Sequence, residues 1–146
     1  MQNKLNQLCK VYPDMPIKNL STKLVDALPK CKDDMDAVQK IKELEYPEIA
    51  PILPHLLTWL KDANWPIAKN IADKLVSIGQ PVMSHVKKIL NGNDDLWKYW
   101  VMLLVVKKMD PMCIQKIKFD LEKISLQNDP EETYMLAKEI LECLKC

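Results

Sequence analysis

The chain has 146 residues, of which 48% are hydrophobic and 28% charged, and this suits one soluble domain with its own core. Its two glycines exclude a glycine-rich phosphate-binding loop and argue against an all-β fold with many tight turns. The net charge is +1 and every basic residue is a lysine. Arginine is the preferred side chain for bidentate recognition of phosphate and guanine, so its absence argues against a protein dedicated to reading nucleic acid.

We expect the first 28 residues to be an N-terminal extension with two short helical segments. One segment covers residues 5–12 and ends at Pro13, and the other covers residues 21–28 and ends at Pro29. The first twelve residues contain no apolar run of seven or more, so we expect no secretory signal, a cytoplasmic location and free thiols at the five cysteines. No apolar run approaches the roughly 20 residues of a membrane span, so no membrane partner is expected.

From Asp33 onward, apolar residues recur at helical spacing in segments joined by short polar turns. Pro51 and Pro54 predict a kink or a late start in the second helix, and Gly79 is expected to cap the end of the third. The segment 94–108 is apolar almost all round and should be the most buried helix. The expected helices cover residues 34–44, 47–60, 64–78, 81–91, 94–108, 110–124 and 129–144.

No segment alternates apolar and polar residues as a strand would, so the predicted fold class is all-α. Short connections between the helices imply antiparallel neighbours. The core is expected to hold the large aliphatic residues of the helical stripes, namely Leu56, Leu57, Leu60, Ile71, Leu75, Val101, Leu104, Ile117, Leu121, Ile140 and Leu141.

Asn64, Asp94, Asp110 and Asp129 are the expected N-caps of their helices, and prolines follow in the first turn after Asn64, Asp110 and Asp129. Three of these helix openings share a pattern that indicates an internal repeat. Aligning the polar residues Asn64, Asp94 and Asp129 also aligns aliphatic residues further along each helix, at spacings of about 30 and 35 residues. The pattern resembles the HEAT repeat and predicts antiparallel helix pairs stacked as a short right-handed solenoid, an α-α superhelix. An ordinary helical bundle with similar caps is the alternative. The expected pairs are 47–79, 80–109 and 110–146.

Two tryptophan-containing strings are the most distinctive parts of the sequence. They read Trp-Leu-Lys-Asp-Ala-Asn-Trp-Pro at 59–66 and Trp-Lys-Tyr-Trp at 97–100. With their surroundings they resemble a family of small bacterial proteins known as domain of unknown function 5071, over roughly residues 28 to 146. The resemblance implies a bacterial, HEAT-like helical domain, here taken as residues 29–146. It brings no activity, cofactor or catalytic residue.

The tryptophans and the polar residues near them form the candidate binding surface. Stacked helix pairs place their turns side by side, so these residues should gather at the junction of the first two pairs. In the alternative interpretation the tryptophans are core anchors, and Asp62 or Asp95 accepts from an indole N–H. Lys98 then either packs its stem on the rings with its ammonium in solvent or pairs with Asp94 or Asp95. The candidate residues are Trp59, Asp62, Asn64, Trp65, Asp95, Trp97, Lys98 and Trp100.

The sequence marks no metal site, cofactor site or catalytic constellation. Cys143 and Cys146 form a lone C-x-x-C at a helix end, where the helix dipole disfavours a thiolate and no second cysteine pair completes a zinc site. Ser84 and His85 are helix neighbours and point apart. We therefore expect a protein that is not an enzyme and binds no metal.

These features favour a non-catalytic protein-interaction module whose partner is another protein or a peptide. Helical solenoids bind through extended surfaces, and a near-neutral charge suits a protein partner. An alternative of another class follows from the HEAT resemblance, because some HEAT-like proteins are DNA-base glycosylases that use tryptophans and a carboxylate in a basic concavity. Here the four tryptophans would supply the rings and Asp62 or Asp95 the acid, but the missing arginine opposes this.

Overall fold

A computed structural model describes residues 11–12, 19–129 and 132–145 of the chain. All regular secondary structure in these residues is helical, so the predicted all-α fold class is confirmed for this part of the chain. None of the described helices is long and apolar enough to cross a membrane. The helical piece expected at 5–12 lies outside the described residues except for Val11 and Tyr12, and so do Cys9 and Cys146.

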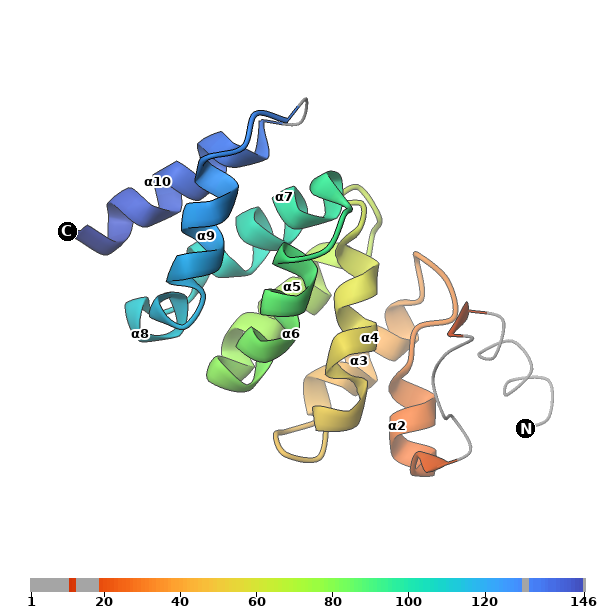
Figure 1. The fold of residues 1–146 in the computed structure, drawn as a ribbon. Helices are drawn as coiled ribbons and strands as arrows, with labels where there is room; N and C mark the ends of the chain where they lie inside the picture. The colour runs from red at the N-terminus through yellow and green to blue at the C-terminus, as the bar shows by residue number, and fades with distance from the viewer. Residues whose placement is uncertain (1–10, 13–18, 130–131, 146) are drawn as a thin grey trace.

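The described residues form nine α-helices and three short 3-10 helices. Figure 1 shows them following one another along the molecule, from α2 at one end to α10 at the other. The α-helices are α2 (Thr22–Ala27), α3 (Met35–Glu43), α4 (Leu53–Leu57), α5 (Ala68–Ile78), α6 (Gln80–Leu90), α7 (Asp95–Leu104), α8 (Pro111–Gln115), α9 (Lys118–Ser125) and α10 (Thr133–Lys145). The 3-10 helices are η2 (Ala50–Ile52), η3 (Thr58–Leu60) and η4 (Val106–Lys108).

The helices contact one another in a regular order. Consecutive helices pack as α2 on α3, α4 on α5, α6 on α7 and α9 on α10. Helices two or three positions apart also pack, with α4 on α6 and α6 on α9 in one row, and α3 on α5, α5 on α7 and α7 on α10 in the other. These contacts place α4, α6 and α9 in one row, and α3, α5, α7 and α10 in a second row that packs against it.

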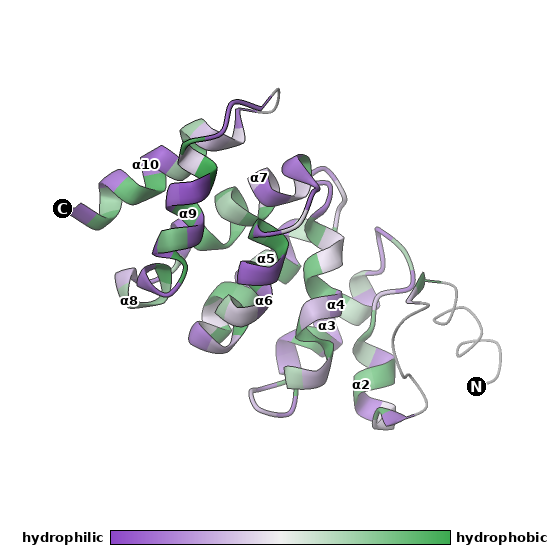
Figure 2. Ribbon diagram, viewed as in Figure 1, coloured by the Kyte–Doolittle hydropathy of each residue, from purple (hydrophilic) through white to green (hydrophobic). Residues whose placement is uncertain are grey.

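One hydrophobic core runs through the whole stack, from Leu24 of α2 to Ile140 of α10. Figure 2 shows apolar and polar residues alternating along the helices, as expected for helices that bury one face. Nine of the eleven predicted core residues are buried, while Leu104 and Leu141 are half-buried and pack against the core. Residues of α2 belong to this same core, so the core crosses the boundary that the sequence suggests after residue 28.

Polar caps fix several helix ends, and of those at Asp34 and Asp94 only the cap at Asp94 is predicted by the sequence. The side chains of Asp34 and Asp94 accept hydrogen bonds from the backbone N–H groups of Ala37, at 3.2 Å, and Trp97, at 3.0 Å. Gly79 ends α5 with a φ of 81°, in the left-handed region that suits glycine, as predicted. The prolines after residue 50 delay α4, which begins at Leu53 after the 3-10 helix η2.

The predicted N-cap at Asn64 is wrong. The helix α5 begins at Ala68, and Asn64 lies in a preceding turn. Asp62 organises that turn, because its carboxylate accepts from the Asn64 N–H at 2.8 Å and its carbonyl accepts from the Trp65 N–H at 3.1 Å. A third hydrogen bond, from the Ala68 N–H to the Trp65 carbonyl at 3.0 Å, then leads into the helix.

The segment 94–108 is shorter and less buried than predicted. The helix α7 ends at Leu104, and only Lys98, Val101 and Met102 of α7 are buried. Leu96 is 45% exposed, because α7 is covered by α5, α6 and α10 on one side and faces solvent on the other. Apolar composition all round the helix does not distinguish these two sides.

The helix predicted at 110–124 is divided in two. Asp110 is the N-cap of α8 and Pro111 its first residue, as predicted, but α8 ends at Gln115 and α9 starts at Lys118. The break falls at Ile117, whose φ of −117° and ψ of 15° lie outside the helical region. Ile117 itself is buried, so the bend directs this residue into the core.

Candidate functional site

The described structure contains an aromatic cluster in which four rings contact one another, namely Tyr12, His55, Trp59 and Trp65. The ring of Trp59 on η3 meets the edge of Trp65 at 5.7 Å and that of Tyr12 at 6.3 Å between ring centroids. Tyr12 also meets His55 at 5.9 Å. All three pairs are edge-to-face, which is a favourable geometry for aromatic rings.

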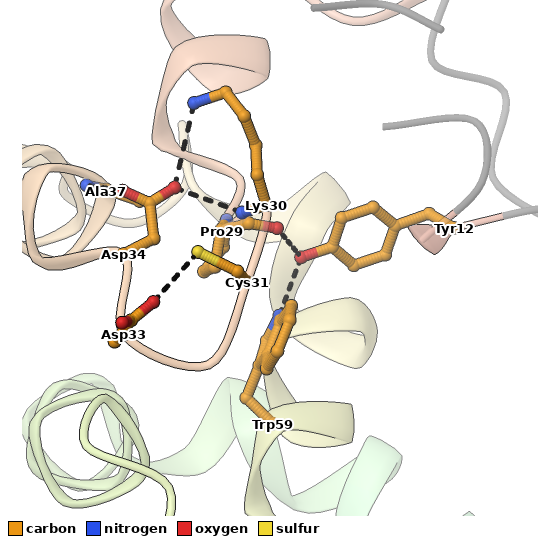
Figure 3. Close-up of polar contacts among 8 residues, drawn as sticks. All are labelled: Tyr12, Pro29, Lys30, Cys31, Asp33, Asp34, Ala37 and Trp59. Carbon is orange, nitrogen blue, oxygen red and sulfur yellow. Dashed lines mark hydrogen bonds and ion pairs between the residues drawn. The ribbon is translucent and has the colours of Figure 1, made fainter. Parts of the chain in front are cut away.

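The Tyr12 hydroxyl joins two polar groups inside this aromatic cluster. It accepts a hydrogen bond from the indole Nε1–H of Trp59 at 2.6 Å and donates one to the carbonyl of Pro29 at 2.8 Å (Figure 3). Tyr12 is 4% exposed and Trp59 8% exposed, so both bonds are buried. Burial raises the pKa of Tyr12 well above its ordinary value, although the bond from Trp59 opposes the shift and Asp34 adds to it.

A clamp centred on Asp34 orients the Pro29 carbonyl. The Asp34 carboxylate accepts from the N–H groups of Lys30, at 3.0 Å, and Ala37, at 3.2 Å, and lies 3.6 Å from the Lys30 ammonium (Figure 3). Burial alone would raise the pKa of Asp34, but these bonds and the Lys30 charge outweigh it and lower the pKa. The turn that carries Pro29 is therefore fixed independently of Tyr12.

Trp97 belongs to a neighbouring groove. Its Nε1–H donates to the Leu57 carbonyl at 2.9 Å, which ties α7 to the end of α4. The Lys61 ammonium lies 4.6 Å from the centre of the Trp97 ring. The Trp97 groove, as we call it, has a volume of about 320 Å³ and is lined by Pro54, Leu57, His85, Lys88, Ile89, residues 92–94 and Trp97.

The remaining predicted residues lie further along the stack. Lys98 is 5% exposed and its ammonium pairs with Asp95 at 3.2 Å. Both line a polar hollow of about 460 Å³ together with Lys123 of α9. Trp100 is half-buried and meets Tyr99 edge-on at 5.1 Å.

The structure thus divides the predicted residue set. Trp59 and Trp65 are in contact, and Asp62 and Asn64 form the turn between them. Trp97 lies at the junction of α4, α6 and α7. This junction adjoins the aromatic cluster, because η3, which carries Trp59, also contacts α7. The Lys98–Asp95 pair faces α9, and Thr133 of α10 donates to the Asp95 carbonyl at 3.3 Å.

The expected indole partners are wrong, whereas the Lys98–Asp95 pair is confirmed. Trp59 and Trp97 donate to Tyr12 and to a backbone carbonyl, and neither donates to Asp62 or Asp95. Sequence reasoning missed Tyr12, which lies 47 positions from Trp59. The one available signal was the rule that a buried indole N–H needs an acceptor.

Within the described residues, no group of three or more His, Cys, Asp or Glu side chains is placed to hold a metal ion. The described cysteines, Cys31, Cys113 and Cys143, are free. Burial lowers the pKa of both His55 and His85. The charge of His85 lowers the pKa of His55 further, and the charge of Lys88 lowers that of His85 further. The arrangement is suited to holding aromatic and apolar groups in fixed positions.

A family model described as Domain of unknown function (DUF5071) matches residues 27–141 of the chain. The search of curated proteins found no match to the chain.

Proposed function

The chain belongs to the family described as Domain of unknown function (DUF5071), and we propose that it is a non-catalytic protein-interaction module that holds a partner peptide in the Trp97 groove. The observation that carries this proposal is the fixed ring of Trp97 at the wall of an open, mainly apolar groove between α4, α6 and α7. Apolar grooves with a few placed polar groups are typical binding sites.

The groove is prepared to receive an apolar side chain. Its wall is rigid, because the Trp97 indole is bonded to the Leu57 carbonyl and Leu57 itself is fully buried. Ile89 of α6, 8% exposed, and Pro54 of α4 complete the apolar surface. A rigid aromatic anchor loses little conformational freedom on binding, which favours affinity.

The charges around the Trp97 groove indicate the chemistry of the partner. Lys61 lies over the Trp97 ring and Lys88 lines the groove, whereas Asp94 is the acidic residue of the lining. His85 adds no charge near neutral pH, because burial and Lys88 lower its pKa. The partner that fits is therefore a peptide segment with one apolar side chain flanked by acidic residues.

The proposed architecture of the domain is a short right-handed solenoid of HEAT-like helix pairs. The two-row contact order supports it, since α4, α6 and α9 pack along one row and α3, α5, α7 and α10 along the other. The pairs α4–α5, α6–α7 and α9–α10 pack between the rows. In such a stack the turns before second helices lie side by side, and the Trp97 groove lies beside one of them. The proposal keeps the bacterial source implied by the family resemblance and the cytoplasmic location expected from the sequence.

The glycosylase alternative gains no support from the tryptophans. Trp59 is buried against Tyr12, so its ring offers no face on which a base stacks. Asp95, one of the two proposed acids, is paired with Lys98. Interaction with a protein segment is the function that the geometry favours.

Selection from a random peptide library on the purified chain tests the proposal. Enriched peptides should share one large apolar residue flanked by Asp or Glu. Lys88→Glu should weaken their binding about tenfold, or about 1.4 kcal/mol, by reversing a charge at the groove. Lys40→Glu, at an exposed position on α3, is the matched control and should bind normally. Enrichment of no common motif, or equal binding by both variants, would refute the proposal.

A further inference from the structure

We propose that the helical domain contains a receptor site for a tyrosine side chain, and that Tyr12 of the same chain is its resident ligand. The site, called here the phenol site, is formed by the Pro29 carbonyl, the Trp59 indole and the ring of His55. It does not use Trp97, so it is separate from the Trp97 groove.

The polar groups of the phenol site select a hydroxyl that both donates and accepts. The Pro29 carbonyl is an acceptor 2.8 Å from the Tyr12 oxygen, and the Trp59 Nε1–H is a donor 2.6 Å from it. A phenol satisfies both groups with one atom, whereas the ring of phenylalanine satisfies neither. Discrimination of this kind is strong, because an unpaired buried donor and acceptor are left behind when the hydroxyl is missing.

The apolar part of the phenol site fits one aromatic ring. The rings of Trp59 and His55 both make edge-to-face contacts with the Tyr12 ring, at interplanar angles of 72° and 84°. With only 4% of its surface exposed, the Tyr12 side chain is enclosed as a bound ligand would be. The chemical class that the site accepts is therefore a phenol, and in a protein this is tyrosine.

The walls of the phenol site are held in place by contacts that do not involve Tyr12. Asp34 fixes the turn beside Pro29 through two backbone N–H groups, and Trp65 packs edge-on against Trp59. These wall residues all fall within the family match at residues 27–141, whereas Tyr12 falls outside it. The phenol site is thus a property of the matched domain, and Tyr12 is supplied to it from a segment that the match does not cover.

Occupation by Tyr12 makes the N-terminal segment an intramolecular competitor. A ligand on the same chain acts at a high effective concentration, of order millimolar for short connections. A tyrosine-bearing segment of another molecule therefore reaches the phenol site only when Tyr12 leaves it. Loss of Tyr12 should turn the site into one that binds free phenols.

The first test uses Tyr12→Ala in the full chain with p-cresol as the probe and toluene as the control that lacks the hydroxyl. We expect p-cresol to raise the thermal midpoint of Tyr12→Ala saturably, to leave the wild type unchanged, and to exceed the effect of toluene. In NMR spectra it should return the Trp59 indole N–H signal toward its wild-type position. No response to p-cresol, or an equal response to toluene, would overturn the proposal.

A second variant keeps the test decisive if Tyr12→Ala does not fold. Tyr12→Phe preserves the ring but leaves the Pro29 carbonyl and the Trp59 indole N–H unpaired. The phenylalanine side chain should therefore bind the phenol site more weakly than Tyr12 does. N-acetyl-tyrosinamide should then shift the Trp59 indole signal of Tyr12→Phe at lower concentration than that of the wild type, and N-acetyl-phenylalaninamide should not. Equal responses to the two amides would show that the site does not recognise the hydroxyl.

Discussion

At the scale of single residues, the Tyr12 hydroxyl shows how one atom couples distant parts of the chain. It bonds to Trp59, 47 positions away, and to Pro29, 17 positions away. Each of these two groups is buried and would be costly to leave without a partner. Nothing in the local sequence around Tyr12 marks it for this role, because the requirement arises at Trp59 and is met only in the folded chain.

Tyr12→Phe should destabilise the protein by about 1–3 kcal/mol, because it strands a buried indole N–H and a buried carbonyl. Urea denaturation followed by circular dichroism measures this change. Tyr46→Phe is the matched control, since Tyr46 is 52% exposed and exposed substitutions usually stay within about 0.5 kcal/mol. Equal midpoints for the two variants would mean that the Tyr12 bonds contribute nothing measurable.

Tyr12 should also give the protein a specific sensitivity to alkaline pH. Its folded pKa is raised by burial, whereas the unfolded pKa is about 10, so the folded state keeps the proton longer. The stability from this group is therefore complete below pH 10 and falls as the pH rises beyond it. Denaturation curves at pH 9 and pH 11 should show a larger loss for the wild type than for Tyr12→Phe, which lacks the ionisable group. Parallel losses would place the alkaline sensitivity elsewhere.

At the scale of helices, polar caps were the most predictable features and turns the least. Asp94 begins α7 as its sequence position predicts, because an aspartate before an apolar run satisfies free backbone N–H groups. Asn64 fails by the same rule, since the competing carboxylate of Asp62 closes a turn first. The break at Ile117 has no proline or glycine to announce it, and only packing of the two short helices reveals it.

Asp94→Ala should cost about 1 kcal/mol of stability, because it removes the acceptor of the Trp97 N–H at the start of α7. Thermal unfolding followed at 222 nm measures the loss. Asn93→Ala, one position earlier and exposed, is the control and should be nearly neutral. If both variants melted together, the cap at Asp94 would be without energetic effect.

At the scale of the whole molecule, the two rows of helices share one core, and this much follows from the spacing of aliphatic residues. The stripes identify Leu56, Leu75 and Leu121 as fully or nearly fully buried, whereas Leu104 was misjudged because α7 is apolar on its solvent side too. The candidate site was less predictable. The sequence strings at 59–66 and 97–100 indicate which segments matter, but the contacts with Tyr12 and Leu57 depend on how the helices stack.

The continuity of the core predicts that α2 unfolds together with the rest of the chain. Leu24 of α2 is 5% exposed and belongs to the same buried cluster as Leu75 and Ile140. Leu24→Ala should therefore destabilise the whole protein by about 2–5 kcal/mol. Because all four tryptophans lie between residues 59 and 100, their fluorescence reports on helices far from the substitution.

Fluorescence and circular dichroism of Leu24→Ala should then show the same lowered midpoint in urea, as expected for one cooperative unit. The control is Leu126→Ala, since Leu126 is 87% exposed and its loss removes almost no packing. A fluorescence midpoint equal to that of the wild type, with an early loss of helical signal, would instead show that residues up to 28 fold as a separate unit. The boundary after residue 28 would in that case divide the molecule energetically, although its core is continuous in space.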